Sequence, residues 1–238
     1  MKGKLTAIVL TAVIIGVLFL SRTGEIRAAG TETENNALFD GLKIVLDAGH
    51  GGIDGGVVGI VTKTKEAEVN LSVTYKLKKL LESVGVQVFL TRTDERALCA
   101  DDIYTKKLDM RLRGELIAGV KPDIIVSIHM NSYPDPSVKG AQTFYYPDSE
   151  SGEQLATMVQ NRLKEFLDPT NKRIAKGEDF FLLRTYSSPS VLVECGFMTC
   201  PEEEALLLTD EYQDMAAYAV FCGLVLSLIH ISEPTRPY

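Results

Sequence analysis

The chain has 238 residues, 45% of them hydrophobic and 24% charged, with a formal net charge of -7 and a pI near 5.1. This length and composition suit one globular domain with a leader or a tail. The acidic balance, with no basic stripe, argues against a nucleic-acid partner. Four cysteines are too few for a disulfide scaffold at this size, so we expect buried free thiols.

The first residues carry the pattern of an export leader. Lys2 and Lys4 precede an apolar run over residues 5–20. The small residues 28–30, which a cleavage site would need, lie well beyond that run. We therefore expect residues 1–30 to form an uncleaved anchor, and the protein to act outside the cytoplasm, membrane-anchored or secreted.

Composition predicts three further segments. Residues 31–41 are polar and predict a stem between the membrane and the domain. Residues 42–228 carry the periodic apolar pattern of the folded domain. Residues 229–238 break this pattern and resemble translated adapter sequence, so this segment, with His230, is excluded from the fold prediction as non-native.

The first predicted strand presents a histidine. The apolar run 44–46 is typical of a buried strand, and it leads into His50, which is flanked by Gly49 and Gly51. The glycines allow a sharp turn and close approach of another molecule. A dinucleotide fingerprint would need glycine in place of Asp54, and no phosphate-binding loop sequence follows. Taken alone, His50 could equally cap a turn.

Helices and strands then alternate along the chain. Thr64 is the predicted cap of the first helix, and Gly85 its end. The apolar periods predict, in order, strand 86–90, a helix through 108–119, strands 123–129 and 140–146, a helix through 155–166, strand 190–194 and a helix through 212–226. Residues 168–189 show no period and predict a surface loop. This order predicts a single α/β domain with a mixed, mostly parallel central sheet and helices on both faces.

Three of the predicted strands lead to polar residues that can share one site. They present His50, His129 and Glu194. Hydrolytic zinc sites use three nitrogen or oxygen ligands and leave a fourth position open, so a carboxylate must join the histidines. Glu66 and Glu68 are the candidates, and two positions apart on a helix they face different ways. We choose Glu66, because the loop from His50 can fold back onto the first helical turn.

Four motifs occur in a family-specific order. They are residues 47–52 (Asp-Ala-Gly-His-Gly-Gly), 66–71 (Glu-Ala-Glu-Val-Asn-Leu), 127–131 (Ser-Ile-His-Met-Asn) and 193–197 (Val-Glu-Cys-Gly-Phe). Over about residues 42–227 the chain thereby resembles the zinc-dependent N-acetylmuramoyl-L-alanine amidases, which cut peptidoglycan. The resemblance implies one Zn²⁺ per chain, bound by His50, Glu66 and His129, with Glu194 as the catalytic carboxylate. It also implies the family's mixed, mostly parallel sheet.

Two positions depart from the family pattern. Ala67 stands where the family has lysine, and Met130 where it has alanine; neither change removes a ligand. The interval between His129 and Glu194 is accounted for by a strand, a helix and a loop, so we expect no inserted helix that plugs the site. The short leader form without wall-binding repeats is most similar to the germination-type amidases of the spore cortex, which remove stem peptides so that muramic lactam can form.

Five further polar residues are considered. Three of them have two interpretations each, and two are expected on the surface. Asp47 and Asn131 can orient the metal ligands or cap turns. Arg184 can reach carboxylates of the substrate or be a surface arginine. Arg111 and Arg113 are expected on a solvated helix face.

Other functions stay open at this point. The same zinc chemistry serves peptidases and carbohydrate deacetylases, and a wall-binding protein without activity is a third alternative. The expected partners are peptidoglycan and, through the leader, the membrane. A further candidate partner is an activating protein that loads or holds the zinc.

Overall fold

The computed structural model describes residues 39–232, so the predicted leader and most of the stem fall outside the described residues. Its centre is a six-stranded sheet of order β2-β1-β3-β6-β4-β5. The strands are β1 (Lys43–Ala48), β2 (Gln87–Leu90), β3 (Ile124–Asn131), β4 (Gln142–Tyr145), β5 (Lys176–Gly177) and β6 (Ser190–Phe197). Only the pair β4–β6 is antiparallel within this sheet. The prediction of a mixed, mostly parallel sheet is confirmed.

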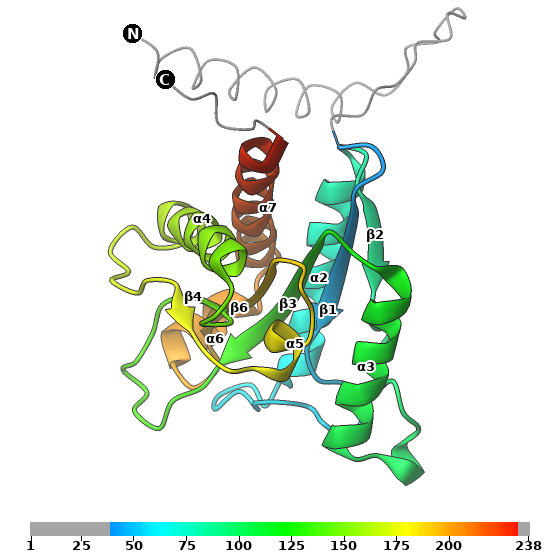
Figure 1. Ribbon diagram of the computed structural model, residues 1–238. Coiled ribbons are helices and arrows are strands. Elements are labelled where there is room, and N and C mark those ends of the chain that lie inside the picture. The colour runs from blue at the N-terminus through cyan, green and yellow to red at the C-terminus, as the bar shows by residue number, and fades with distance from the viewer. Residues whose placement is uncertain (1–38, 233–238) are drawn as a thin grey trace, which may run out of the picture. The chain divides into compact units, whose positions relative to one another are not determined.

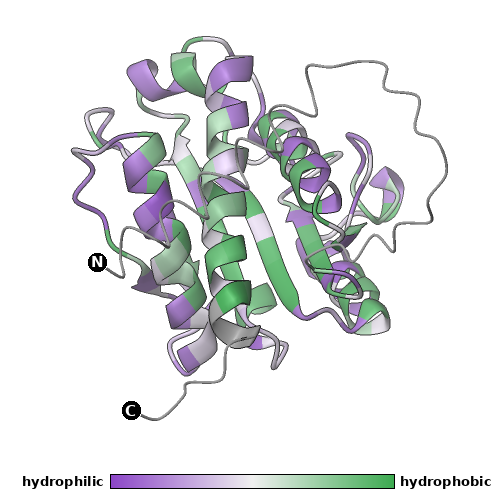
Figure 2. Ribbon diagram, turned by 90° about the horizontal axis from the view of Figure 1, so that it is seen from above, coloured by the Kyte–Doolittle hydropathy of each residue, from purple (hydrophilic) through white to green (hydrophobic). Residues whose placement is uncertain are grey.

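Helices cover both faces of the sheet (Figure 1). They are α2 (Glu66–Glu82), α3 (Lys106–Val120), α4 (Glu150–Phe166), α5 (Phe181–Arg184), α6 (Pro201–Leu207) and α7 (Asp210–Ser232), with a 3₁₀ turn, η1 (Asp101–Ile103). Because side chains alternate along a strand, Ile44 and Leu46 of β1 belong to the core that α2, α4 and α7 cover, whereas Val45 belongs to the core on the other face, with residues of α3 and α5. Figure 2 shows hydrophobic residues along the central strands and on parts of the helices, whose other parts are hydrophilic. All four cysteines are free, three of them buried, as expected.

The start of α2 differs from the prediction. The helix begins at Glu66, and its N-terminal cap position, Lys65, makes no side-chain cap hydrogen bond. Instead, loop carbonyls accept from the first helical N–H groups: Val57 O from Glu66 N at 2.8 Å and Gly55 O from Ala67 N at 3.1 Å. Thr64 was therefore the wrong cap, because the loop before the helix folds over its end and satisfies the free donors. The placement of Glu66 in the first turn is confirmed.

Residues 168–189 are not a featureless loop. They contain β5, which pairs with β4, and the single-turn helix α5. Leu182 and Leu183 of α5 are buried on the sheet. Elements of two and four residues are too short to show a period, which is why the sequence pattern did not indicate them.

The last helix, α7, packs across the sheet against α2 and α4 (Figure 1). By length and composition its stretch Asp210–Ile229 could cross a membrane, with a mean hydropathy of 1.4, but 50% of this stretch is buried inside the domain. The helix continues to Ser232, into the segment 229–238 that we had excluded from the fold.

The contact between α7 and α4 gives a first prediction. A Cβ on Gly223 would lie 2.6 Å from Val159 Cα, so alanine there must push the helices apart. We expect Gly223→Ala to lower the free energy of unfolding by about 1–3 kcal/mol. The control, Gly119→Ala, is at an exposed helical position with open space around it and should raise the free energy of unfolding by up to about 1 kcal/mol. Urea unfolding measures both, and a stabilised Gly223→Ala protein would contradict the close packing.

Candidate active site

The structure brings His50, Glu66 and His129 together at the carboxyl ends of β1 and β3. Their nitrogen and carboxylate ligand atoms all lie within 4.8 Å of one another. Glu66 Oε2 is 3.3 Å from His50 Nε2, and Glu66 Oε1 is 3.0 Å from His129 Nδ1. Two imidazoles and one carboxylate are a donor set that suits Zn²⁺.

His50 has an uncommon backbone conformation. Its φ is 61°, in the left-handed region that residues other than glycine rarely adopt, and the turn continues through Gly52, with a φ of 59°. In this conformation His50 Nδ1 lies 2.9 Å from Asp54 Oδ1, while Nε2 faces Glu66. A carboxylate on one ring nitrogen fixes the orientation of the other. Sequence reasoning missed Asp54, whose one signal was its position four residues after His50.

Two glycines make room for the three side chains. A Cβ on Gly49 would overlap the ring of His129. A Cβ on Gly56 would overlap Glu66 Oε2 and would lie 2.8 Å from His50 Cδ2. The side chains are therefore packed directly against backbone, and only glycine fits at these two positions.

Glu66 is fixed by hydrogen bonds on both carboxylate oxygens. Only 2% of it is exposed, and it accepts from Val57 N at 2.9 Å, Met130 N at 3.1 Å and Asn70 Nδ2 at 3.1 Å. Burial by itself would raise the pKa of Glu66, but the hydrogen bond with His129 and the charges of both histidines outweigh it and lower the pKa to about 2. The carboxylate is ionised at neutral pH. Glu68, the other candidate, is exposed.

Glu194 lies beside this group with a different environment. In the sheet it is the register partner of His129, on β6. Its Oε2 is buried and has no hydrogen-bond partner within the described residues. Burial raises the pKa of Glu194 to about 7, with His129 opposing and Glu66 adding to the rise. A buried, unpaired carboxyl group that titrates near neutral pH is suited to general acid–base catalysis.

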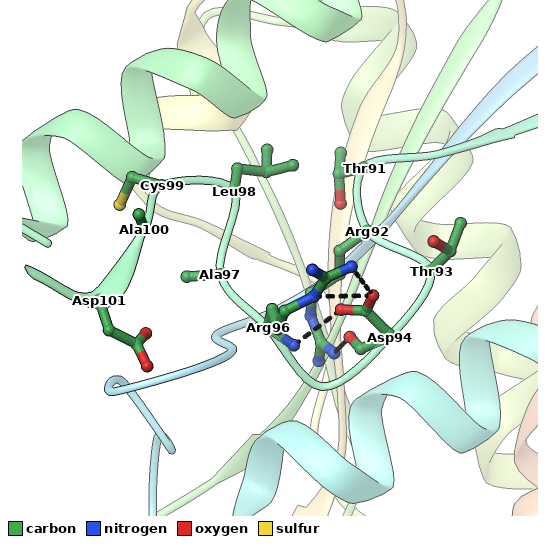
Figure 3. Close-up of a pocket in the computed structure, with 10 residues that line it drawn as sticks. All are labelled: Thr91, Arg92, Thr93, Asp94, Arg96, Ala97, Leu98, Cys99, Ala100 and Asp101. Atoms are coloured by element: carbon green, nitrogen blue, oxygen red, sulfur yellow. Dashed lines mark hydrogen bonds and ion pairs between the residues drawn. The ribbon is translucent and has the colours of Figure 1, made fainter.

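One cavity of about 280 Å³ is lined by both histidines and by Glu194. Its lining includes Gly49, His50, Asp54, His129 and Glu194, with Lys106, Met110, Phe180, Phe181 and Leu192 among the other lining residues. A larger hollow of about 580 Å³ lies within the loop that follows β2 and is lined by residues 91–94 and 96–101 (Figure 3). It contains none of the residues predicted for catalysis or metal binding, so the smaller cavity is the candidate site.

The comparison with known proteins agrees with this geometry. The profile of one protein family, described as N-acetylmuramoyl-L-alanine amidase, matches residues 44–225. The chain belongs to this family of amidases. A germination-specific N-acetylmuramoyl-L-alanine amidase of Bacillus subtilis is 32% identical over 198 residues, which cover 82% of this chain and 83% of the relative.

Solved structures of amidases share the fold. The CwlD amidase from Clostridioides difficile, solved in complex with the GerS lipoprotein, has a TM-score of 0.76 and 37% identity, over 79% of this chain and 99% of that chain. The amidase AmiC2 of Nostoc punctiforme has a TM-score of 0.68 and 34% identity, over 79% of this chain and 97% of that chain. The chain is thus an N-acetylmuramoyl-L-alanine amidase that acts on peptidoglycan.

Three other predicted residues of the amidase have local partners. Asp47 is buried and accepts hydrogen bonds from the hydroxyl groups of Thr91 and Ser127. Asn131 Oδ1 accepts from Ser132 N at 2.8 Å, as in a turn. Arg184 Nη1 donates to both carboxylate oxygens of Asp179, at 2.8 and 2.9 Å.

Arg113 does not lie on a solvated face, which corrects our prediction. It is 1% exposed, and its guanidinium pairs with Asp47 Oδ1 at 2.7 Å and Asp109 Oδ2 at 2.8 Å. Arg111, two positions earlier and therefore on another side of α3, is exposed as predicted. The buried face of α3 contains Asp109, Arg113 and Ile117. Two of these residues are charged, so the spacing of the leucines did not predict which face of the helix is buried.

The raised pKa of Glu194 gives a prediction about stability. A glutamate titrates near pH 4.5 in the unfolded chain but near pH 7 in the folded amidase, so the folded state holds this proton more tightly. The contribution of this raised pKa to the free energy of unfolding is complete below pH 4.5 and is lost as the pH rises to about 7. With a chelator present, we expect the wild type to lose up to about 3 kcal/mol relative to Glu194→Gln over this window. Urea unfolding across the window measures the difference, and a constant difference would contradict the raised pKa.

Proposed function

We propose that the amidase binds one Zn²⁺ through His50, Glu66 and His129 and uses Glu194 as its catalytic carboxylate. The observation that carries the proposal is that Glu194, whose Oε2 is buried and has no hydrogen-bond partner among the described residues, lines one cavity with His50 and His129. The ring nitrogens of these two histidines converge with the ionised carboxylate of Glu66. The donor set fits zinc in type and spacing, and Asp54 supports one of the imidazoles from behind.

In the proposed mechanism zinc activates a water and side chains of the protein transfer the proton. Zinc held by His50, Glu66 and His129 would lower the pKa of a bound water to about 7. Glu194 accepts a proton from the attacking water and then donates it to the departing L-alanine nitrogen, whose bond to the lactyl carbonyl breaks. Glu66 and Asp54 keep the imidazoles oriented. Because Oε2 of Glu194 has no hydrogen-bond partner among the described residues, it is free to take this proton and to return it.

A set of three glutamate variants tests the assignment. We expect Glu194→Ala to retain zinc and to lose about 10²–10⁴-fold in hydrolysis of peptidoglycan. Glu66→Gln should lose both zinc and activity, whereas the exposed control Glu68→Gln should keep both. Metal analysis and product analysis are the measurements, and the metal content of the wild type alone shows whether the chain loads zinc unaided.

The products also separate the amidase from its alternatives. Free amino groups on L-alanine with intact glycan are expected. New peptide ends within the stem would indicate a peptidase, and free glucosamine amines a deacetylase. Full activity of Glu194→Ala would remove Glu194 from the proposed mechanism.

We further propose a role in the spore cortex, with membrane attachment through residues 1–30. The support is the similarity to the germination-specific amidase and to CwlD. Since that CwlD structure contains a lipoprotein, a lipoprotein partner is proposed for this amidase as well. We propose that Asp47 and Asn131 help to orient the metal ligands. We propose that Arg184 reaches carboxylates of the stem peptide, because its Cζ is 6.0 Å from the ring centre of Phe181, which lines the cavity.

The cortex role predicts complementation. Expressed during sporulation in a Bacillus subtilis strain that lacks its germination-specific amidase, the chain should restore muramic lactam to the cortex, because stem peptides must be removed before the lactam can close. The Glu194→Ala variant is the matched control and should leave the lactam absent. Analysis of digested cortex measures this, and an active chain that reaches the spore but restores no lactam would argue for another wall substrate.

A further inference from the structure

We propose that Arg92 is a positioning residue that ties the loop carrying His50 to the helix carrying Glu66. This inference rests on the proposed metal ligands. It concerns the spacing between two of them rather than the chemistry of bond cleavage. The loop in question, residues 48–50, will be called the histidine loop.

Arg92 is buried and donates to backbone on both sides of the site. It is 4% exposed, and it follows β2 at the base of the hollow drawn in Figure 3. Its Nε donates to Ala48 O at 2.9 Å, and its Nη2 donates to Gly49 O at 3.0 Å and to Ala67 O at 2.7 Å. Nη1 donates to Asp94 O at 2.8 Å, within its own loop. One planar group thus joins the histidine loop to the residue that follows Glu66.

Arg113 holds the same loop through a second guanidinium group. Its Nη1 donates to Ala48 O at 2.8 Å and its Nη2 to His50 O at 2.6 Å. The three successive carbonyls of the histidine loop therefore all accept from arginine. A left-handed backbone at a residue such as His50 costs energy and persists only where its surroundings enforce it. The two arginines provide that enforcement.

The contacts of Arg92 are not those of an ordinary ion pair. Arg113 has Asp47 and Asp109 as carboxylate partners, whereas the hydrogen bonds of Arg92 within residues 39–232 all go to carbonyl oxygens. Burying a second cation near the first is costly. The fork of arginine can reach several carbonyls at once, which the single ammonium group of lysine cannot. This arrangement suits the positioning of backbone better than it suits stability.

Zinc affinity in the absence of substrate tests the inference. We expect Arg92→Met to weaken zinc binding about 10- to 100-fold, as loss of support behind a metal site does. Arg92→Lys keeps the buried charge but not the fork, so it should weaken binding in the same direction. The matched control is Arg96→Met, in the same loop, whose side chain is 85% exposed and pairs with Asp94. Its zinc affinity should equal that of the wild type.

Three further measurements separate the outcomes. Circular dichroism of the metal-free proteins shows whether each variant folds, and the visible spectrum of the cobalt-loaded proteins shows whether the ligand geometry changes. A folded Arg92→Met protein with wild-type zinc affinity and cobalt spectrum would overturn the inference; if it does not fold, Arg92→Lys decides by the same criteria. A wild-type chain that binds no zinc would overturn the proposed metal site itself, which is a different result.

Discussion

The site depends on one buried carboxylate, that of Glu66. Removing a carboxylate from water costs several kcal/mol unless donors replace the lost hydration. Here the donors are the backbone N–H groups of Val57 and Met130 and the side chain of Asn70, and the ring of His129 lies within hydrogen-bond distance. These groups belong to the loop before α2, to β3 and to α2 itself. A single charge therefore orders segments that are distant in sequence, and the fold must bring them together to bury it.

The second carboxyl group in the cavity shows how environment divides two similar residues into two roles. Glu66 receives hydrogen bonds on both oxygens and has a pKa of about 2, whereas Glu194 is buried with an unpaired oxygen and has a pKa of about 7. When surroundings push the pKa values of two acids apart, the lower one stays an anion and the higher one can exchange a proton. The start of α2 thus presents a permanent ligand charge and β6 a titratable group, and His129 lies next to both.

The sequence indicated the fold and the acid and imidazole residues because their signals are strong. Buried strands read as short apolar runs, and the polar residue that follows each run must emerge at the sheet edge, which located His50, His129 and Glu194. The residues that sequence reasoning missed have no such signal. Arg92 donates to backbone carbonyls, and a carbonyl is present at every position, so no partner residue reveals it. Arg113 has a partner four residues earlier in Asp109, but an i,i+4 ion pair is equally common on a solvated helix face. Asp54 and α5 were missed because a lone aspartate in a glycine-rich loop and a four-residue helix have no period.

The geometry of the histidine loop explains why buried arginines hold it and apolar side chains do not. At the turn before and through His50, the carbonyls of residues 48–50 accept from arginine side chains, and a buried carbonyl without a donor costs about as much as a lost hydrogen bond. An apolar side chain could fill the space but could not donate. A guanidinium group does both, and the pairing of Arg113 with Asp47 and Asp109 keeps its charge compensated. Since Asp47 belongs to β1 and Asp109 to α3, the loop is fixed to the sheet and to a helix before any metal or substrate binds.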